Sequence, residues 1–261
     1  MKKMIGFGAV ALCAAVACAD VTSANTVGYM NTNLRANYTA TGASFCSIGA
    51  EGFKLSELKM TGLPKTVNGT IVIQLLDDLG STKEIYKYYK GGRGSYATEG
   101  WYNATTLIDG SDADHEILLP KGQGLWFKGV ADLSFTSSGE VIAGDFTTEL
   151  RANYTLLSNP FPAAIKLSKI KLEGLPKTVN GTIVIQLLDD LGSTKEIYKY
   201  YKGGRGSYAT EGWYNATTLI DGSDADHEIE IPAGVAMWFK GIDGLSATLT
   251  CPYTLNGTAA E

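Results

Sequence analysis

The residues best suited to binding a metal ion lie in one acidic stretch that occurs twice. Residues 109–116 (DGSDADHE) place carboxylates around a glycine, and the same letters recur at 221–228. Ca²⁺ prefers such carboxylate oxygens, although the spacing departs from the EF-hand pattern. The alternative is a solvated acidic turn whose Asp side chains hydrogen-bond the nearby backbone. The candidate calcium ligands are Asp109, Asp112, Asp114, Glu116, Asp221, Asp224, Asp226 and Glu228.

The sequence contains few residues suited to acid–base or nucleophilic catalysis. His115 and His227 are the only imidazoles, each beside carboxylates, and no Gly-x-Ser-x-Gly elbow is present. Zinc is disfavoured because each copy of the acidic stretch offers a single His and no usable Cys. The glycines at 91–94 are not followed by the Lys-Ser/Thr of a phosphate-binding loop. The sequence therefore predicts that the protein is not an enzyme and that calcium is its one candidate cofactor.

A dense group of aromatic residues is the second candidate site. Tyr and Trp rings carried on β-sandwich loops can stack on sugar faces, while nearby polar groups hydrogen-bond the hydroxyls. The alternative, which these strand-forming residue types favour, is that alternate rings pack the core. The candidate carbohydrate-binding residues are Tyr86, Tyr88, Tyr96, Trp101, Tyr102, Tyr198, Tyr200, Tyr208, Trp213 and Tyr214.

Charge and the first residues indicate where the protein acts. The chain carries 22 basic and 27 acidic residues, a net charge of −5, which disfavours a nucleic-acid partner. Lys2 and Lys3 precede an uncharged run that ends in Ala17-Cys18-Ala19, the pattern of a secretory signal peptide. We expect a secreted, periplasmic or cell-surface protein without a transmembrane segment after cleavage. Lipid anchoring at Cys18 is the weaker alternative.

Two cysteines remain after such a cleavage. Cys46 and Cys251 lie near opposite ends of the mature chain. In an oxidising compartment they could form a disulfide that clasps the two ends together. Alternatively they are two separate buried thiols that behave as small hydrophobic residues. Spacing alone leaves both interpretations open.

The part of the sequence that must position these residues occurs as two tandem copies. Residues 62–117 recur without a change at 174–229, and similarity continues on both sides. A period this long indicates tandem domains rather than a solenoid. The identity indicates a recent duplication or conversion, with an assembly error in the sequence as the alternative. We expect a signal peptide over 1–19, a first domain over 20–139 and a second over 140–261.

Within each copy the pattern is that of strands. Asn68-Gly69 between β-branched residues predicts a hairpin turn, and 71–76 predicts a strand covered on both faces. Residues 85–89 read as the returning strand, and only 54–60 could form a helical turn. The sequence predicts an all-β protein: two tandem homologous β-sandwich-like or small-barrel domains with little helix.

Several short motifs stand out along the chain: residues 20–29, Gln74-Leu75-Leu76, Gly100-Trp101-Tyr102, the turn at 120–126 and residues 138–141. In these motifs the chain resembles a group of secreted, two-repeat, β-rich proteins of verrucomicrobial and lentisphaeral bacteria. The resemblance covers nearly the whole mature chain, and its motifs mark strands and turns rather than a functional site. The resemblance implies secretion and β architecture, and no activity.

These observations favour a non-catalytic structural or interaction protein of the cell envelope or extracellular space. The alternative is a bivalent carbohydrate-binding protein, and a glycoside hydrolase is a third class. The expected partners are an extracellular glycan or other envelope proteins. Repeated linker-like segments at 27–28, 143–144 and 256–257 predict two units in near-fixed register along a rod, unless the cysteine clasp folds the chain back.

Overall fold

The computed structural model describes residues 27–77, 80–92, 94–189, 192–204 and 206–255. The expected signal peptide, Cys18 and the segment 256–257 lie outside the described residues. Within the described ranges no helix is long and apolar enough to cross a membrane. The prediction of an all-β chain is confirmed, since antiparallel strands dominate. The only helical elements among the described residues are two short 3-10 turns, η1 (Leu55–Glu57) and η2 (Leu167–Lys169).

The first unit contains two antiparallel sheets and a short two-stranded ribbon. One sheet has the order β1-β11-β3, with β5 also paired to β11, and the other has the order β2-β10-β6-β7-β8. The ribbon pairs β4 with β9. The strands are β1 (Val27–Asn33), β2 (Tyr38–Gly42), β3 (Phe45–Cys46), β4 (Gly52–Lys54), β5 (Lys59–Thr61), β6 (Asn68–Leu76), β7 (Thr82–Tyr89), β8 (Gly100–Asn103), β9 (Leu118–Pro120), β10 (Gly124–Lys128) and β11 (Ser134–Val141).

The second unit repeats this plan. Its sheets have the orders β12-β21-β15 and β13-β20-β16-β17-β18, and β14 pairs with β19. The strands are β12 (Phe146–Leu150), β13 (Tyr154–Ser158), β14 (Ile165–Lys166), β15 (Ile170–Glu173), β16 (Asn180–Leu188), β17 (Thr194–Tyr201), β18 (Gly212–Asn215), β19 (Glu230–Ile231), β20 (Ala236–Lys240) and β21 (Leu245–Leu249).

Each unit is sandwich-like, with its core between the two sheets. In the first unit Phe127 of β10 stacks on Phe135 of β11, so the two sheets meet through their rings at 5.0 Å. Ile71 and Ile73 of the central strand β6 are fully buried in the same core, as the apolar run predicted. Over the described residues no sheet closes on itself, so the sandwich rather than the small barrel is the observed form.

The Asn68-Gly69 pair does not form the predicted hairpin turn. Asn68 already pairs with Tyr89 of β7, and the register shifts between Asn68 and Val72. Gly69 has φ of +70°, a conformation that favours glycine, and therefore allows a bulge inside β6. Strand β6 instead runs on to Leu76, and the chain reverses after it, where the Asp77 N–H donates to Ser81 O at 2.8 Å.

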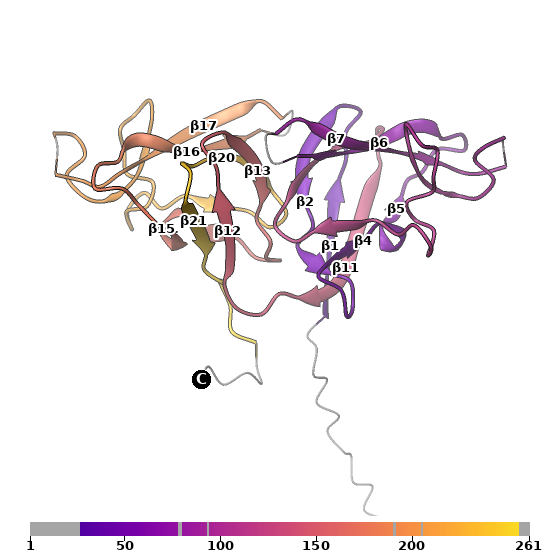
Figure 1. Ribbon diagram of the computed structural model, residues 1–261, viewed down its shortest axis with the longest axis horizontal. Helices are drawn as coiled ribbons and strands as arrows, with labels where there is room; N and C mark the ends of the chain where they lie inside the picture. Colours follow the sequence, from indigo (N-terminus) through magenta and orange to yellow (C-terminus); the bar gives the residue numbers. More distant parts are fainter. Residues whose placement is uncertain (1–26, 78–79, 93, 190–191, 205, 256–261) are drawn as a thin grey trace, which may run out of the picture.

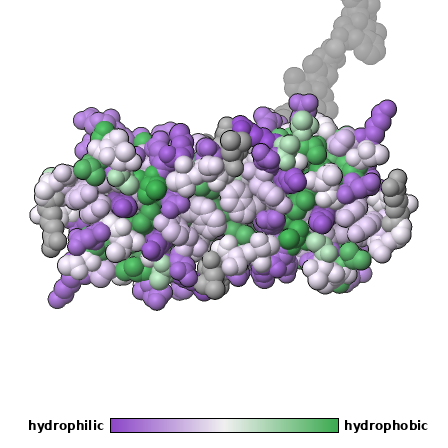
Figure 2. Space-filling view, turned by 90° about the horizontal axis from the view of Figure 1, so that it is seen from above, coloured by the Kyte–Doolittle hydropathy of each residue, from purple (hydrophilic) through white to green (hydrophobic). Residues whose placement is uncertain are grey.

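The two units lie side by side, and the chain enters β1 and leaves β21 on their lower side (Figure 1). Strand β11 continues through the expected boundary at Gly139, and the segment that connects the units is 142–145. Seen from above, the units form one continuous elongated body on which hydrophobic residues are scattered among polar ones (Figure 2).

The contacts between the units are reciprocal. Thr41 of β2 bridges to Val235, and Leu157 of β13, which corresponds in sequence to Thr41, bridges to Gln123, which corresponds to Val235. The backbone N–H of Gly42 donates to Gly234 O at 3.1 Å, while that of the equivalent Ser158 donates to the equivalent Gly122 O at 2.9 Å. Such self-complementary contacts are the mark of an approximate two-fold axis.

A small third core reinforces this interface. Leu76 and Leu156 are buried there, and the Trp126 and Trp238 rings approach to 6.5 Å between centroids. The reciprocal contacts hold the two units against each other, and the free edges of β2 and β13 cover each other's neighbouring turns. Corresponding sheets of the two units face the same side (Figure 1). The rod with the same face repeated along it stays a prediction, which small-angle scattering would test.

Candidate functional site

Most of the aromatic residues proposed for carbohydrate binding are buried in the cores. Trp101 is 2% exposed and contacts Tyr88 edge-on at 5.2 Å and Phe127 at 5.7 Å. Ring faces in such positions are not available for stacking on a sugar. The buried members of the predicted set are Tyr86, Tyr88, Trp101, Tyr102, Tyr198, Tyr200, Trp213 and Tyr214.

Hydroxyl groups of the buried tyrosines reach carboxylates at the edge of the core. Tyr86 Oη donates to Glu84 Oε2 at 2.6 Å, and Tyr88 Oη donates to Glu99 Oε1. Burial, and then the Glu84 hydrogen bond, raises the pKa of Tyr86 to about 12. Burial and the Glu99 hydrogen bond raise the pKa of Tyr88 further. These tyrosines are therefore neutral packing groups with anchored hydroxyls.

Tyr96 and its counterpart Tyr208 are different, because each is only half-buried and lines a pocket. Tyr89, which the predicted set omitted, stacks on Tyr96 with 3.6 Å between ring centroids. The alternation of side chains along β7 could have identified Tyr89 from the sequence. Tyr86 and Tyr88 share the inward face of β7, so Tyr89 must point to the opposite face.

The acidic stretch folds as a turn whose carboxylates accept hydrogen bonds from the chain. Asp109 Oδ1 accepts from the Ser111 N–H at 2.9 Å and from Ser111 Oγ at 2.6 Å. Asp112 Oδ1 accepts from the Asp114 N–H at 3.0 Å, and Glu116 Oε1 accepts from the Ser56 N–H at 3.0 Å. These oxygens are thus directed at separate donors rather than at one ion.

In the second copy the carboxylates of Asp221, Asp224 and Glu228 accept the equivalent backbone hydrogen bonds. His115 and His227 are exposed at the ends of these turns. Among the residues that the structure describes, no group of three or more His, Cys, Asp or Glu side chains could hold a metal ion. The turns therefore supply no geometry on which to base a calcium proposal.

Both remaining cysteines are free thiols in the structure. Cys46 is buried, and burial is the main reason that its pKa is raised. Its side chain belongs to the core of the second unit, together with Ile142, and the half-buried Cys251 packs against that same core. Residues near both ends of the described chain thus meet at one core without a bridge between the sulfurs.

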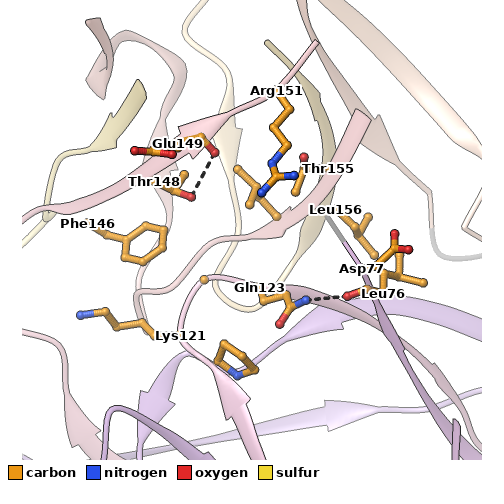
Figure 3. Close-up of a pocket in the computed structure, with 13 residues that line it drawn as sticks. Leu76, Asp77, Lys121, Gln123, Phe146, Thr148, Glu149, Arg151, Thr155 and Leu156 are labelled. Carbon is orange, nitrogen blue, oxygen red and sulfur yellow. Dashed lines mark hydrogen bonds between the residues drawn. The ribbon is translucent and has the colours of Figure 1, made fainter. Parts of the chain in front are cut away.

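A cleft between the units is a site that sequence reasoning missed, because residues from both copies form it. Its volume is about 330 Å³, and its walls come from the 120–123 turn, β12 and the start of β13 (Figure 3). Lys121 Nζ lies 5.7 Å from the centroid of the Phe146 ring. Gln123 Nε2 donates to Leu76 O at 2.9 Å and so fixes the floor.

Charged side chains of both signs line this cleft, including Asp77, Lys121, Glu149 and Arg151. The positions that correspond to Lys121 and Glu149 across the approximate two-fold axis carry Ala233 and Asn33. The charges of Lys121 and Glu149 are therefore present on one side of the interface only, whereas Asp77 and Arg151 have charged counterparts in Asp189 and Arg35. The cleft can hold a small polar molecule, and its mixed charges specify no single reaction.

No protein-family model, curated protein or solved structure matches this chain.

Proposed function

We propose that this protein is an exported, non-catalytic structural or interaction protein of the cell envelope or extracellular space. The observation that carries the proposal is the reciprocal interface, which holds two near-identical β units as one body. A fixed pair of identical units suits a protein that presents the same surface twice, because duplication of a binding surface gives avidity.

The roles of the polar residues support the non-catalytic part of the proposal. Asp109, Asp112 and Glu116 accept backbone hydrogen bonds that shape their own turns and the neighbouring η1 segment. Tyr86 and Tyr88 are core residues with high pKa values. Carbohydrate binding through Trp101 and Trp213 loses its basis, since both indoles are buried.

Fractionation of the cells that produce the protein tests its export. We expect the mature chain in the envelope or the medium, with a mass that corresponds to cleavage after Ala19. The variant Ala19→Lys should accumulate as the uncut precursor, because signal peptidase requires a small residue there. Recovery of full-length wild-type protein in the cytoplasm would overturn the proposal.

A matched variant separates free secretion from lipid anchoring. If Cys18 carried a lipid, Cys18→Ser would release the wild-type membrane-bound form into the soluble fraction. We expect the same distribution for the wild type and Cys18→Ser, as cleavage after Ala19 removes residue 18.

A further inference from the structure

Each unit carries a pocket at the loop that follows the long hairpin strand. In the first unit the pocket has a volume of about 320 Å³ and lies beside Tyr89, Lys90 and Gly91 at the end of β7. Asn68, at the start of β6, forms the neighbouring wall. Gly94, Ser95 and Tyr96 complete the lining. We call this pocket and its counterpart in the second unit the twin tyrosine pockets.

The apolar part of the pocket is a pair of stacked rings held from behind. Tyr89 and Tyr96 are parallel to within 6°, and the buried Tyr102 ring meets both of them edge-on, at 5.9 and 5.0 Å. The Tyr102 hydroxyl is fixed in turn by Thr98, whose Oγ1 lies 2.9 Å away. The ring pair is therefore positioned before any ligand arrives, which lowers the entropic cost of binding.

Polar groups surround this pair of rings. Asn68, Lys90 and Ser95 are exposed at the rim and supply an amide, an ammonium and a hydroxyl. Lys90 Nζ donates to Pro64 O at 2.8 Å, which fixes the direction of its side chain. None of the described residues that line the pocket carries a carboxylate, so a cationic ligand is disfavoured.

We propose that each twin tyrosine pocket binds one sugar unit of a neutral glycan. A pyranose has apolar C–H faces that match half-exposed aromatic rings and equatorial hydroxyls that match an amide, hydroxyl and ammonium rim. The volume falls within the range of small-ligand sites. This inference goes beyond the proposed function, because it depends neither on export nor on the lack of catalysis.

The second pocket reproduces the first. It has a volume of about 330 Å³, and Tyr201 stacks on Tyr208 with 3.7 Å between the centroids. The residues of both pockets lie within the identical blocks 62–117 and 174–229, so their affinities should be equal. The ends of β7 and β17 lie at opposite ends of the molecule (Figure 1). Two such sites on one body would cross-link glycan chains.

Isothermal titration of the purified mature chain tests the proposal after a screen of neutral gluco-, manno-, xylo- and chito-oligosaccharides identifies a binder. We expect two equal sites per chain. Tyr96→Ala and Tyr208→Ala should each leave one site of unchanged affinity, and the double variant should leave none. Tyr29→Ala removes a tyrosine that is 76% exposed on β1 and is the matched control with two sites.

A second variant guards against loss of loop structure in the alanine variants. Ser95→Arg keeps both rings and fills the pocket from an exposed position, so it should also remove one site. The wild type should make a soluble polysaccharide of the same sugar turbid, whereas a single-site variant should not. Failure of every glycan to bind, a stoichiometry of one, or binding by the double variant would overturn the proposal. Fractionation results would be unaffected by any of these outcomes.

Discussion

Leu156 offers the sharpest test of the interface between the units. Its side chain is 2% exposed in the small core that Leu76 and Ala236 share. A Cβ added at Gly124 of the first unit would lie 2.5 Å from Leu156 Cγ, so the leucine rests directly on that backbone. Leu156→Ala removes this contact and leaves a cavity, which costs about 3 kcal/mol. The folded-to-unfolded ratio should fall by roughly two orders of magnitude.

Urea unfolding followed by tryptophan fluorescence measures this loss. The matched control is Leu118→Ala, which makes the same change at a leucine that is 43% exposed and should cost less than about 0.5 kcal/mol. Limited proteolysis adds a second readout, because separation of the units should speed cleavage in the connecting segment 142–145. Equal costs for the two variants, together with unchanged proteolysis, would refute the idea that Leu156 holds the units together.

Three further predictions concern the interface, the buried tyrosines and the acidic turn. Gly42→Ala should destabilise the protein by about 1–3 kcal/mol in urea unfolding, because a Cβ there would lie 2.0 Å from Ser158 Oγ across the interface. The raised pKa values of Tyr86 and Tyr198, about 12 against an ordinary 10, mean that the folded state holds their protons longer. The protonated hydroxyls therefore contribute fully to the free energy of unfolding below about pH 10, and this contribution is lost between about pH 10 and 12. Ultraviolet absorbance should show tyrosinate forming together with alkaline unfolding. Asp109→Ala should lower the free energy of unfolding by about 1–3 kcal/mol, because the Ser111 N–H and hydroxyl lose their acceptor. Calcium or a chelator should leave the melting temperature of the wild type unchanged. A calcium-dependent rise in melting temperature that Asp109→Ala removes would contradict the structural role of this turn.

The strand pattern was predictable because it depends on local residue types. β-Branched and aromatic runs separated by glycine-rich turns gave the all-β class, and the apolar run around Ile71 and Ile73 gave a central strand. The Asn68-Gly69 turn was misassigned because the same dipeptide serves a hairpin turn or a bulge. The long-range pairing of Asn68 with Tyr89 decides between them. A local pattern does not contain that pairing.

The candidate site was harder to predict because burial depends on packing across sheets. In sequence, Trp101 and Tyr88 resemble aromatic residues of a binding surface. Only the packing of Tyr88 on Trp101, and of Trp101 on Phe127, identifies them as core residues. Tyr89 could have been separated from Tyr88 by strand alternation. The cleft beside Lys121 had no local signal, since it exists only where two copies of the fold meet.

The positions at which the two copies differ agree with the arrangement of the units. At the interface, Gly42 faces Gly234 while its counterpart Ser158 faces Gly122, and Gln123 corresponds to Val235. Once two units are joined in one chain, each side of their interface can be altered separately, and Lys121 and Glu149 add two charges on one side only. At the two ends of the molecule, by contrast, the copies do not differ, because the blocks that carry the twin tyrosine pockets are identical. A body that is asymmetric in the middle and duplicated at its ends is suited to hold the same kind of ligand at two places, and the titration of the two pockets tests this directly.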